Sequence, residues 1–122
     1  MVDWSQIENF RPAEFECKCC GEVVLDNSFV QTLDLARTLA SIPFTITSGY
    51  RCEAHNKAVG GKPTSSHTIG KASDIKVSGS RERFYILSAL VDAGFSRIGI
   101  GSNFIHVDND NNKADSVVWL YS

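Results

Sequence analysis

Two histidines in the second half of the chain stand near side chains that could bind a metal together with them. His67 is followed by a turn residue, Gly70, a small residue, Ala72, and then a carboxylate, Asp74. This segment can fold back so that the imidazole and the carboxylate meet one ion. Alone, a histidine beside a serine is more often a surface or core residue than a ligand.

His106 is the third candidate ligand. It lies between Ile105 and Val107, so on a strand its imidazole would face away from its apolar neighbours. Together, His67, Asp74 and His106 form a donor set that suits a catalytic zinc ion with its fourth position open to water. Such an ion lowers the pKa of bound water toward about 7 and polarises a carbonyl. The pattern therefore indicates hydrolytic chemistry.

The cysteines leave three interpretations open. All four, Cys17, Cys19, Cys20 and Cys52, lie in the first half of the chain. Cys17 and Cys20 have the spacing of a zinc-ribbon pair, and a structural zinc site would add Cys52 and His55. A disulfide between the 17–20 cluster and Cys52 is the second interpretation. Free buried thiols are the third, favoured because a chain without an export signal starts in a reducing compartment.

Two long helices are expected to support these residues. The first begins at a cap from Asp26 or Asn27 and ends before Pro43. Its apolar positions follow helical spacing at Phe29, Leu33, Ala36 and Leu39. The second covers residues 81–93, between a Ser80 cap and a Gly94 stop. Its inward positions are predicted to be Phe84, Leu87, Leu90 and Val91.

Five short segments have the alternating or β-branched composition of strands, namely 44–47, 72–77, 97–100, 104–107 and 117–121. Residues 1–26 are expected to be irregular apart from a helical turn near Pro12. Residues 48–66 are predicted to form a loop with a short helix near 53–57. The order of the elements, with late hairpins, predicts an α+β fold with a small, mostly antiparallel sheet and two main helices. One domain is expected to span residues 1–122.

Composition excludes several classes of protein. The 43% hydrophobic and 21% charged residues of this 122-residue chain argue against disorder and against fibrous structures. The net charge of -2, with basic and acidic residues interspersed, argues against nucleic-acid binding. No apolar run approaches the roughly 18 to 20 residues of a membrane span, and the first residues lack the pattern of a signal peptide. We expect a monomer that is made in the cytoplasm and does not insert into a membrane.

The same residues carry a family resemblance that extends from about Phe15 to Trp119. As a set, the motifs resemble the zinc D-Ala-D-Ala carboxypeptidase family, which has the hedgehog/DD-peptidase fold and includes phage endolysins and bacterial murein peptidases. The motifs are Ser48-Gly49-Tyr50-Arg51, Asn56 with Val59-Gly60-Gly61, Ser65-x-His67-x-x-Gly70-x-Ala72-x-Asp74-Ile75, Ile98-Gly99-Ile100-Gly101 and Phe104-Ile105-His106-Val107-Asp108. The start Phe15-x-Cys17-x-Cys19-Cys20-Gly21 also resembles small phage-type members.

The resemblance implies roles for individual residues. It implies that His67, Asp74 and His106 bind zinc. It also implies that Arg51 holds a substrate carboxylate or stabilises the oxyanion, for which a planar guanidinium is suited. Tyr50 and Ser66 would lie beside the site as substrate-binding or shaping residues. His55 would either contact substrate or pack within its loop.

The sequence departs from part of the family at the position of the general base. Several branches place a glutamate three residues before the last zinc histidine, where this chain has Asn103. Members that end in His-Val-Asp resemble this sequence more closely. Asp108, which a strand would place on the same face as His106, could take the proton from water or could orient His106.

The resemblance thus predicts a zinc peptidase that hydrolyses amide bonds of peptidoglycan stem peptides at the bacterial cell wall. The lack of a signal peptide suits a phage or prophage lysis enzyme. D-Ala-D-Ala, L-Ala-D-Glu and cross-link bonds are all cleaved within the family. Two other functions remain open, a zinc-binding recognition module without catalysis and a structural phage tail domain that reuses the fold.

Overall fold

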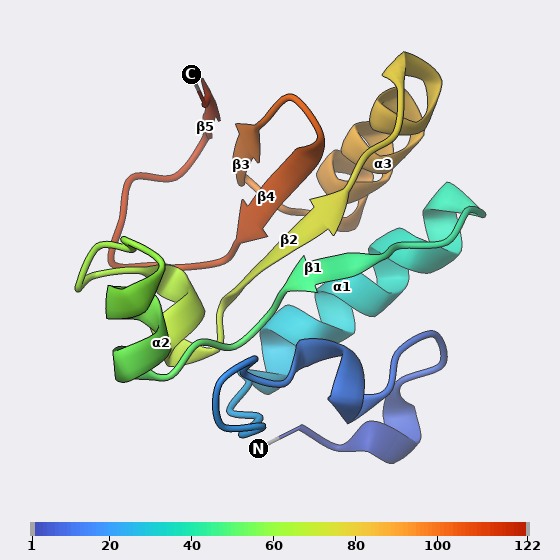
Figure 1. Cartoon of the computed structure of the whole chain (residues 1–122). Coiled ribbons are helices and arrows are strands. Elements are labelled where there is room, and N and C mark those ends of the chain that lie inside the picture. The colour runs from blue at the N-terminus through green and yellow to red at the C-terminus, as the bar shows by residue number, and fades with distance from the viewer. Residues whose placement is uncertain (1, 122) are drawn as a thin grey trace.

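A five-stranded sheet forms the centre of the protein, seen in a computed structural model that describes residues 2–121 (Figure 1). The strands lie in the order β1-β2-β4-β3-β5. Their bounds are β1 Ile46–Ser48, β2 Ala72–Lys76, β3 Arg97–Ile100, β4 Phe104–Asp108 and β5 Val117–Leu120. All neighbours are antiparallel except β3 and β5, which run parallel. The predicted α+β class with a mostly antiparallel sheet is confirmed.

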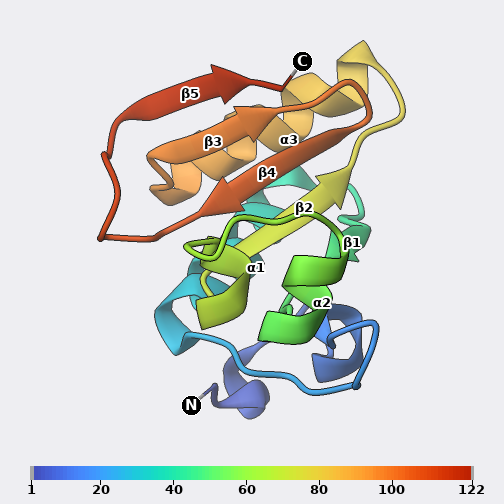
Figure 2. The same cartoon turned by 60° about the vertical axis from the view of Figure 1, so that its left-hand side comes forward.

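Two long helices, α1 (Asn27–Ala40) and α3 (Ser80–Ala93), pack against each other on one face of the sheet (Figures 1 and 2). The Asp26 carboxylate caps α1 by accepting the Phe29 N–H at 3.0 Å, as the sequence predicts. The short helix α2 (Glu53–Ala58) lies on the other side of the sheet, and 3-10 turns cover Trp4–Gln6, Pro12–Phe15 and Ser66–Ile69. No helix within residues 2–121 has the length and apolar character needed to cross a bilayer.

Alternation along β2 and β4 separates the core from the opposite face. Ile75, Ile105 and Val107 are fully buried among the side chains of α1 and α3. Their neighbours Asp74 and His106 therefore project from the other face of the sheet. The core thus holds the two strands in a register that places polar side chains together on the face opposite α1 and α3.

The helices bury somewhat different positions from those expected. In α3, Leu90 is buried, but Phe84 and Val91 are more than half exposed. The buried stripe runs through Ile86, Ala89 and Leu90 instead, because the helix presents its i, i+3, i+4 face to α1 and the sheet. Leu39 of α1 is likewise 49% exposed, because the buried stripe of this helix continues from Ala36 to Ala40 and Leu39 lies beside it.

The ends of several elements also differ from the prediction. Gly79, rather than Ser80, occupies the cap position of α3, and no side chain caps this helix. The first strand covers 46–48 rather than 44–47, because β1 pairs with β2 only from Ile46 onward. Gly94 ends α3 in the left-handed conformation, as predicted.

Candidate active site

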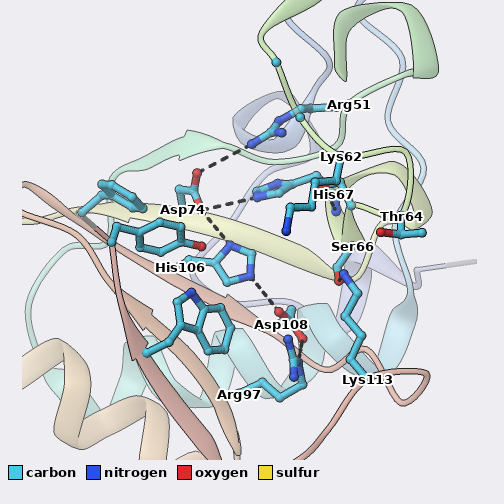
Figure 3. Close-up of a pocket in the computed structure, with 16 residues that line it drawn as sticks. Arg51, Lys62, Thr64, Ser66, His67, Asp74, Arg97, His106, Asp108 and Lys113 are labelled. Atoms are coloured by element: carbon cyan, nitrogen blue, oxygen red, sulfur yellow. Dashed lines mark hydrogen bonds and ion pairs between the residues drawn. The ribbon is translucent and has the colours of Figure 1, made fainter. Parts of the chain in front are cut away.

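His67, Asp74 and His106 meet on the face of the sheet opposite α1 and α3 (Figure 3). Asp74 of β2 and His106 of β4 are register partners, so their side chains lie next to each other. His67 comes from the 3-10 turn Ser66–Ile69 that precedes β2. Asp74 Oδ1 lies 3.0 Å from His106 Nδ1 and 3.4 Å from His67 Nε2. The structure therefore brings the three predicted ligands together.

Each imidazole is oriented by a hydrogen bond from its other nitrogen. His67 Nδ1 lies 2.8 Å from the Gly49 carbonyl, which can only accept a hydrogen bond, so Nδ1 carries the proton and Nε2 is free to bind a metal. His106 Nε2 donates to Asp108 Oδ2 at 2.7 Å, which directs Nδ1 toward Asp74. Metal-binding histidines are commonly held in this way. The donor set and its supporting hydrogen bonds fit a zinc ion with three protein ligands.

The electrostatics of the set favour a cation. Burial raises the pKa of the Asp74 carboxyl, but the close approach of the His106 and His67 imidazoles outweighs burial and holds the pKa well below its usual range. For His106, burial lowers the pKa, whereas hydrogen bonds to Asp108 and Asp74 raise it above its ordinary value. Asp74 is therefore anionic, and a metal ion would compete with a proton for the Nδ1 position of His106.

Asp108 lies on the far side of His106 from Asp74 (Figure 3). Its side chain is only 1% exposed, and both oxygens accept hydrogen bonds. Oδ2 accepts from His106, while Oδ1 accepts from Arg97 Nε at 2.7 Å and from the Asp110 N–H at 3.1 Å. Arg97 in turn stacks on the Trp119 ring, 5.0 Å from its centroid. Asp108 is thus fixed between the histidine and a largely buried arginine.

Arg51 faces Asp74 across the opening of the site (Figure 3). Its guanidinium donates to Ser48 Oγ at 3.2 Å and to Asn56 Oδ1 at 3.1 Å, and it lies 3.9 Å from Asp74 Oδ2. Gly61 allows this arrangement, because a Cβ there would collide with Asn56 Oδ1. The motif residues around Arg51 therefore serve to aim its planar fork at the candidate metal site.

The pocket above these residues has a volume of about 580 Å³. Ser66 lines it, is buried, and donates to Asp110 Oδ2 at 2.7 Å. Tyr50 and His55 do not line it. Tyr50 packs against the hydrophobic core, and His55 lies on α2. Within residues 2–121, the structure brings Ser66 to the pocket but neither of the other two.

The sequence did not reveal several residues of the pocket. Lys62 and Lys113 add positive charge to its wall, and Arg97 and Trp119 support Asp108. Lys113 Nζ donates to the buried Ser66 Oγ at 3.0 Å. Trp119 and Tyr121 form an aromatic wall of the pocket. The feature of the sequence that indicates this wall is Gly99, which pairs with His106 on β4 and with Trp119 on β5.

Replacing Gly99 with alanine should destabilise this wall. A Cβ at Gly99 would come within 2.6 Å of Trp119 Nε1 and also collide with the Tyr121 ring. We expect the free energy of unfolding, measured by urea denaturation, to fall by about 1–3 kcal/mol as the rings are displaced. Gly79→Ser is the matched control, because nothing lies within 4 Å of its Cβ position, its backbone is extended, and serine is favourable at the cap position of a helix. Equal, small effects of both substitutions would contradict the packing role of Gly99.

The fold and the site define a small metallohydrolase of the α+β class, with two histidines and an aspartate above a sheet and an arginine at the opening. Residues 8–108 match the family model described as Peptidase M15. The chain belongs to this family, and it is a metallopeptidase whose family acts on peptidoglycan. A search of curated proteins finds no match.

Proposed function

We propose that this protein is a zinc peptidase that cleaves stem peptides of peptidoglycan at the bacterial cell wall, as a phage or prophage lysis enzyme that acts as a monomer. The convergence of His67, Asp74 and His106 beside Arg51 carries the proposal. The lysis role is supported by the resemblance of the cysteine-rich start to small phage-type members. The bond cleaved is one between or within stem peptides.

The charge of the pocket supports a peptide substrate that carries carboxylates. Four cationic side chains line it, Arg51, Lys62, Arg97 and Lys113, against two carboxylates. Arg97 is paired with the buried Asp108 at 2.7 Å, whereas Arg51 and Lys113 make looser contacts with Asp74 and Asp110 at 3.9 and 3.6 Å. Among the described residues, Lys62 has no carboxylate partner. Stem peptides carry free carboxylates at D-residues, and guanidinium and ammonium groups bind carboxylates through charge-assisted hydrogen bonds. These side chains would orient the stem peptide over the ligand set.

Each residue of the site then has a defined task. His67, Asp74 and His106 would hold zinc, which when bound supplies Lewis acidity toward a carbonyl and toward water. Arg51 would donate to the substrate, either to a terminal carboxylate or to the oxygen that gains negative charge during attack on the amide. Asp108 would hold His106 in the tautomer that leaves Nδ1 free. The occupied oxygens of Asp108 favour this positioning role over that of a general base.

Digestion of purified sacculi tests the function. Protein loaded with Zn²⁺ should release stem-peptide fragments whose masses identify the bond, and protein treated with a chelator should release none. Restoring Zn²⁺ to the stripped sample should restore the fragments. If the loaded protein binds zinc but releases no fragment, the enzyme proposal fails and a recognition module, consistent with Asn103 in place of the glutamate, takes its place.

The Asp108→Asn variant separates positioning from proton transfer. Asparagine keeps the shape and can still accept from His106, but it removes the negative charge that faces Arg97 and the imidazole. We expect zinc affinity, measured by competition with a chelator, to fall about 10- to 100-fold. Activity at saturating zinc should largely recover.

If Asp108 were the general base, the Asp108→Asn variant would give the opposite pattern. Zinc affinity would stay near that of the wild type, while kcat would remain low however much zinc was added. Asp115→Asn is a suitable control, because this aspartate is exposed in the loop between β4 and β5. It should change neither quantity.

A further inference from the structure

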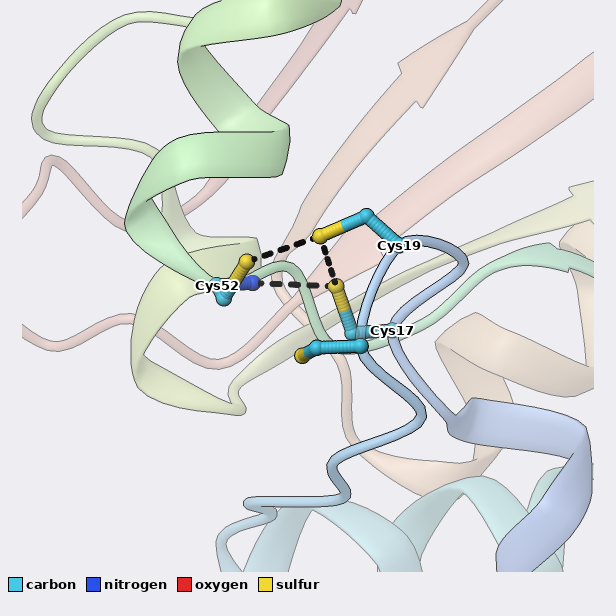
Figure 4. Close-up of side chains that lie close together, drawn as sticks. Cys17, Cys19 and Cys52 are labelled. Carbon is cyan, nitrogen blue, oxygen red and sulfur yellow. Dashed lines mark hydrogen bonds between the residues drawn. The ribbon is translucent and has the colours of Figure 1, made fainter.

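All four cysteines of the chain gather in one place, and none of them lines the pocket. Figure 4 shows Cys17, Cys19 and Cys52 of this group. Cys17, Cys19 and Cys20 come from the irregular segment before α1, and Cys52 comes from the N-terminus of α2. Their four Sγ atoms all lie within 4.8 Å of one another. Two segments that are far apart in the sequence therefore meet here through their sulfur atoms.

The sulfur spacing is that of a metal site rather than of a disulfide. Cys17 Sγ lies 3.7 Å from Cys19 Sγ, and Cys19 Sγ lies 3.2 Å from Cys52 Sγ. A disulfide would require about 2.05 Å. Four sulfurs placed about 2.3 Å from a tetrahedral zinc ion are separated by about 3.8 Å. The cluster needs only small side-chain adjustments to reach this geometry.

The backbone around the cluster supports thiolate ligands. Cys17 to Gly21 forms a tight turn, in which the Gly21 N–H donates to the Cys17 carbonyl at 2.8 Å and Gly21 has a positive φ of 74°. The Cys52 N–H points at Cys17 Sγ at 3.4 Å, and the His55 N–H points at Cys52 Sγ at 3.4 Å. Such N–H groups offset the negative charge that four thiolates would bring to one ion.

We propose that Cys17, Cys19, Cys20 and Cys52 bind a second zinc ion in a closed, structural site with four thiolate ligands. The thiolates fill all four positions, so this ion has no place for water or substrate, unlike the ion at the active site. His55 contributes its backbone N–H rather than its imidazole. The site differs in this from the sequence-based alternative that included the His55 side chain.

The position of the cluster indicates which segments a bound ion would hold together. Cys52 directly follows Arg51, and the same segment is held by the Tyr50 N–H, which donates to the Phe15 carbonyl at 2.9 Å. Gly49, whose carbonyl orients His67, touches the Phe15 backbone so closely that a Cβ would not fit. A zinc ion at the cluster would fasten the irregular start of the chain to the segment that positions Arg51 and His67.

Metal counting on the full-length chain tests the proposal. Protein purified under reducing conditions and loaded with Zn²⁺ should hold two ions per chain. Asp74→Ala should retain one ion, and so should Cys20→Ala, which removes an exposed ligand. With Co²⁺, the sulfur-to-cobalt charge-transfer absorption should appear in the wild type and in Asp74→Ala and disappear in Cys20→Ala. Ser28→Ala, at an exposed position on α1 outside both clusters, serves as a control for handling and should retain both ions.

A measurement on the wild type covers the case in which Cys20→Ala does not fold. All four thiols should resist alkylation while zinc is bound and react together once a chelator removes it. One ion per loaded wild-type chain, with no charge-transfer band, would overturn the proposal. A chain mass lowered by two hydrogens before reduction would also overturn it, because it shows a disulfide. Failure to digest sacculi, with two ions still bound, would contradict the proposed function and leave this inference intact.

Discussion

Asp74→Ala should abolish zinc binding at the active site and reduce the rate of sacculus digestion by about 10³-fold or more. Asp74 is the anionic ligand, and its carboxylate lies between the two imidazoles. A bound metal ion supplies several kcal/mol of transition-state stabilisation, and each 1.4 kcal/mol corresponds to about tenfold in rate. The rate of fragment release and the zinc content of the variant, both measured at the same free zinc concentration, check this expectation.

Asp92→Ala is the matched control for Asp74→Ala. Asp92 is an exposed aspartate on α3, far from the pocket lining, so its removal should change neither zinc content nor rate. Circular dichroism and urea unfolding should show that Asp74→Ala is still folded, because the core beneath β2 does not include this side chain. An Asp74→Ala protein that digests sacculi at the wild-type rate would rule out the assigned ligand set.

The residues of the site that can be predicted from the sequence are those whose positions follow from local patterns. Strand alternation alone predicts that His106 faces away from its apolar neighbours. The structure confirms that Ile105 and Val107 belong to the hydrophobic core and that His106 does not. Asp74 follows the same rule on β2. The pairing of these two strands then brings the side chains into one register. The short spacing from His67 to Asp74 predicts their approach because a turn separates them.

The remaining part depends on contacts between distant segments. Trp119 reaches the site only because β5 adds to β3 in parallel at the far edge of the sheet, which no local pattern predicts. Arg97 reaches Asp108 by the pairing of β3 with β4. In the same way, Phe84 and Val91 satisfy a helical apolar spacing yet remain exposed, because the packing of α3 against α1 and the sheet decides which stripe is buried.

Arg51→Lys should lower kcat/KM for stem peptides by about 10²-fold, even though the charge is kept. The guanidinium donates to Ser48 and Asn56 and still lies near Asp74, so its plane is fixed relative to the ligand set. A lysine offers a point charge without the planar fork and cannot make all of these contacts. Losing one well-placed donor to developing negative charge costs about 10² to 10³ in rate. Steady-state kinetics with a soluble stem peptide measure the effect.

The division of that loss between KM and kcat identifies what Arg51 holds. If it binds a terminal carboxylate, KM should rise while kcat is kept, and a substrate amidated at that carboxylate should lose affinity for the wild type but little more for the variant. If it stabilises the oxyanion, kcat should fall for both substrates. Arg81→Lys on the exposed start of α3 is the matched control and should change neither constant. An Arg51→Lys enzyme with unchanged kcat and KM, and with its full complement of zinc, would remove Arg51 from both roles.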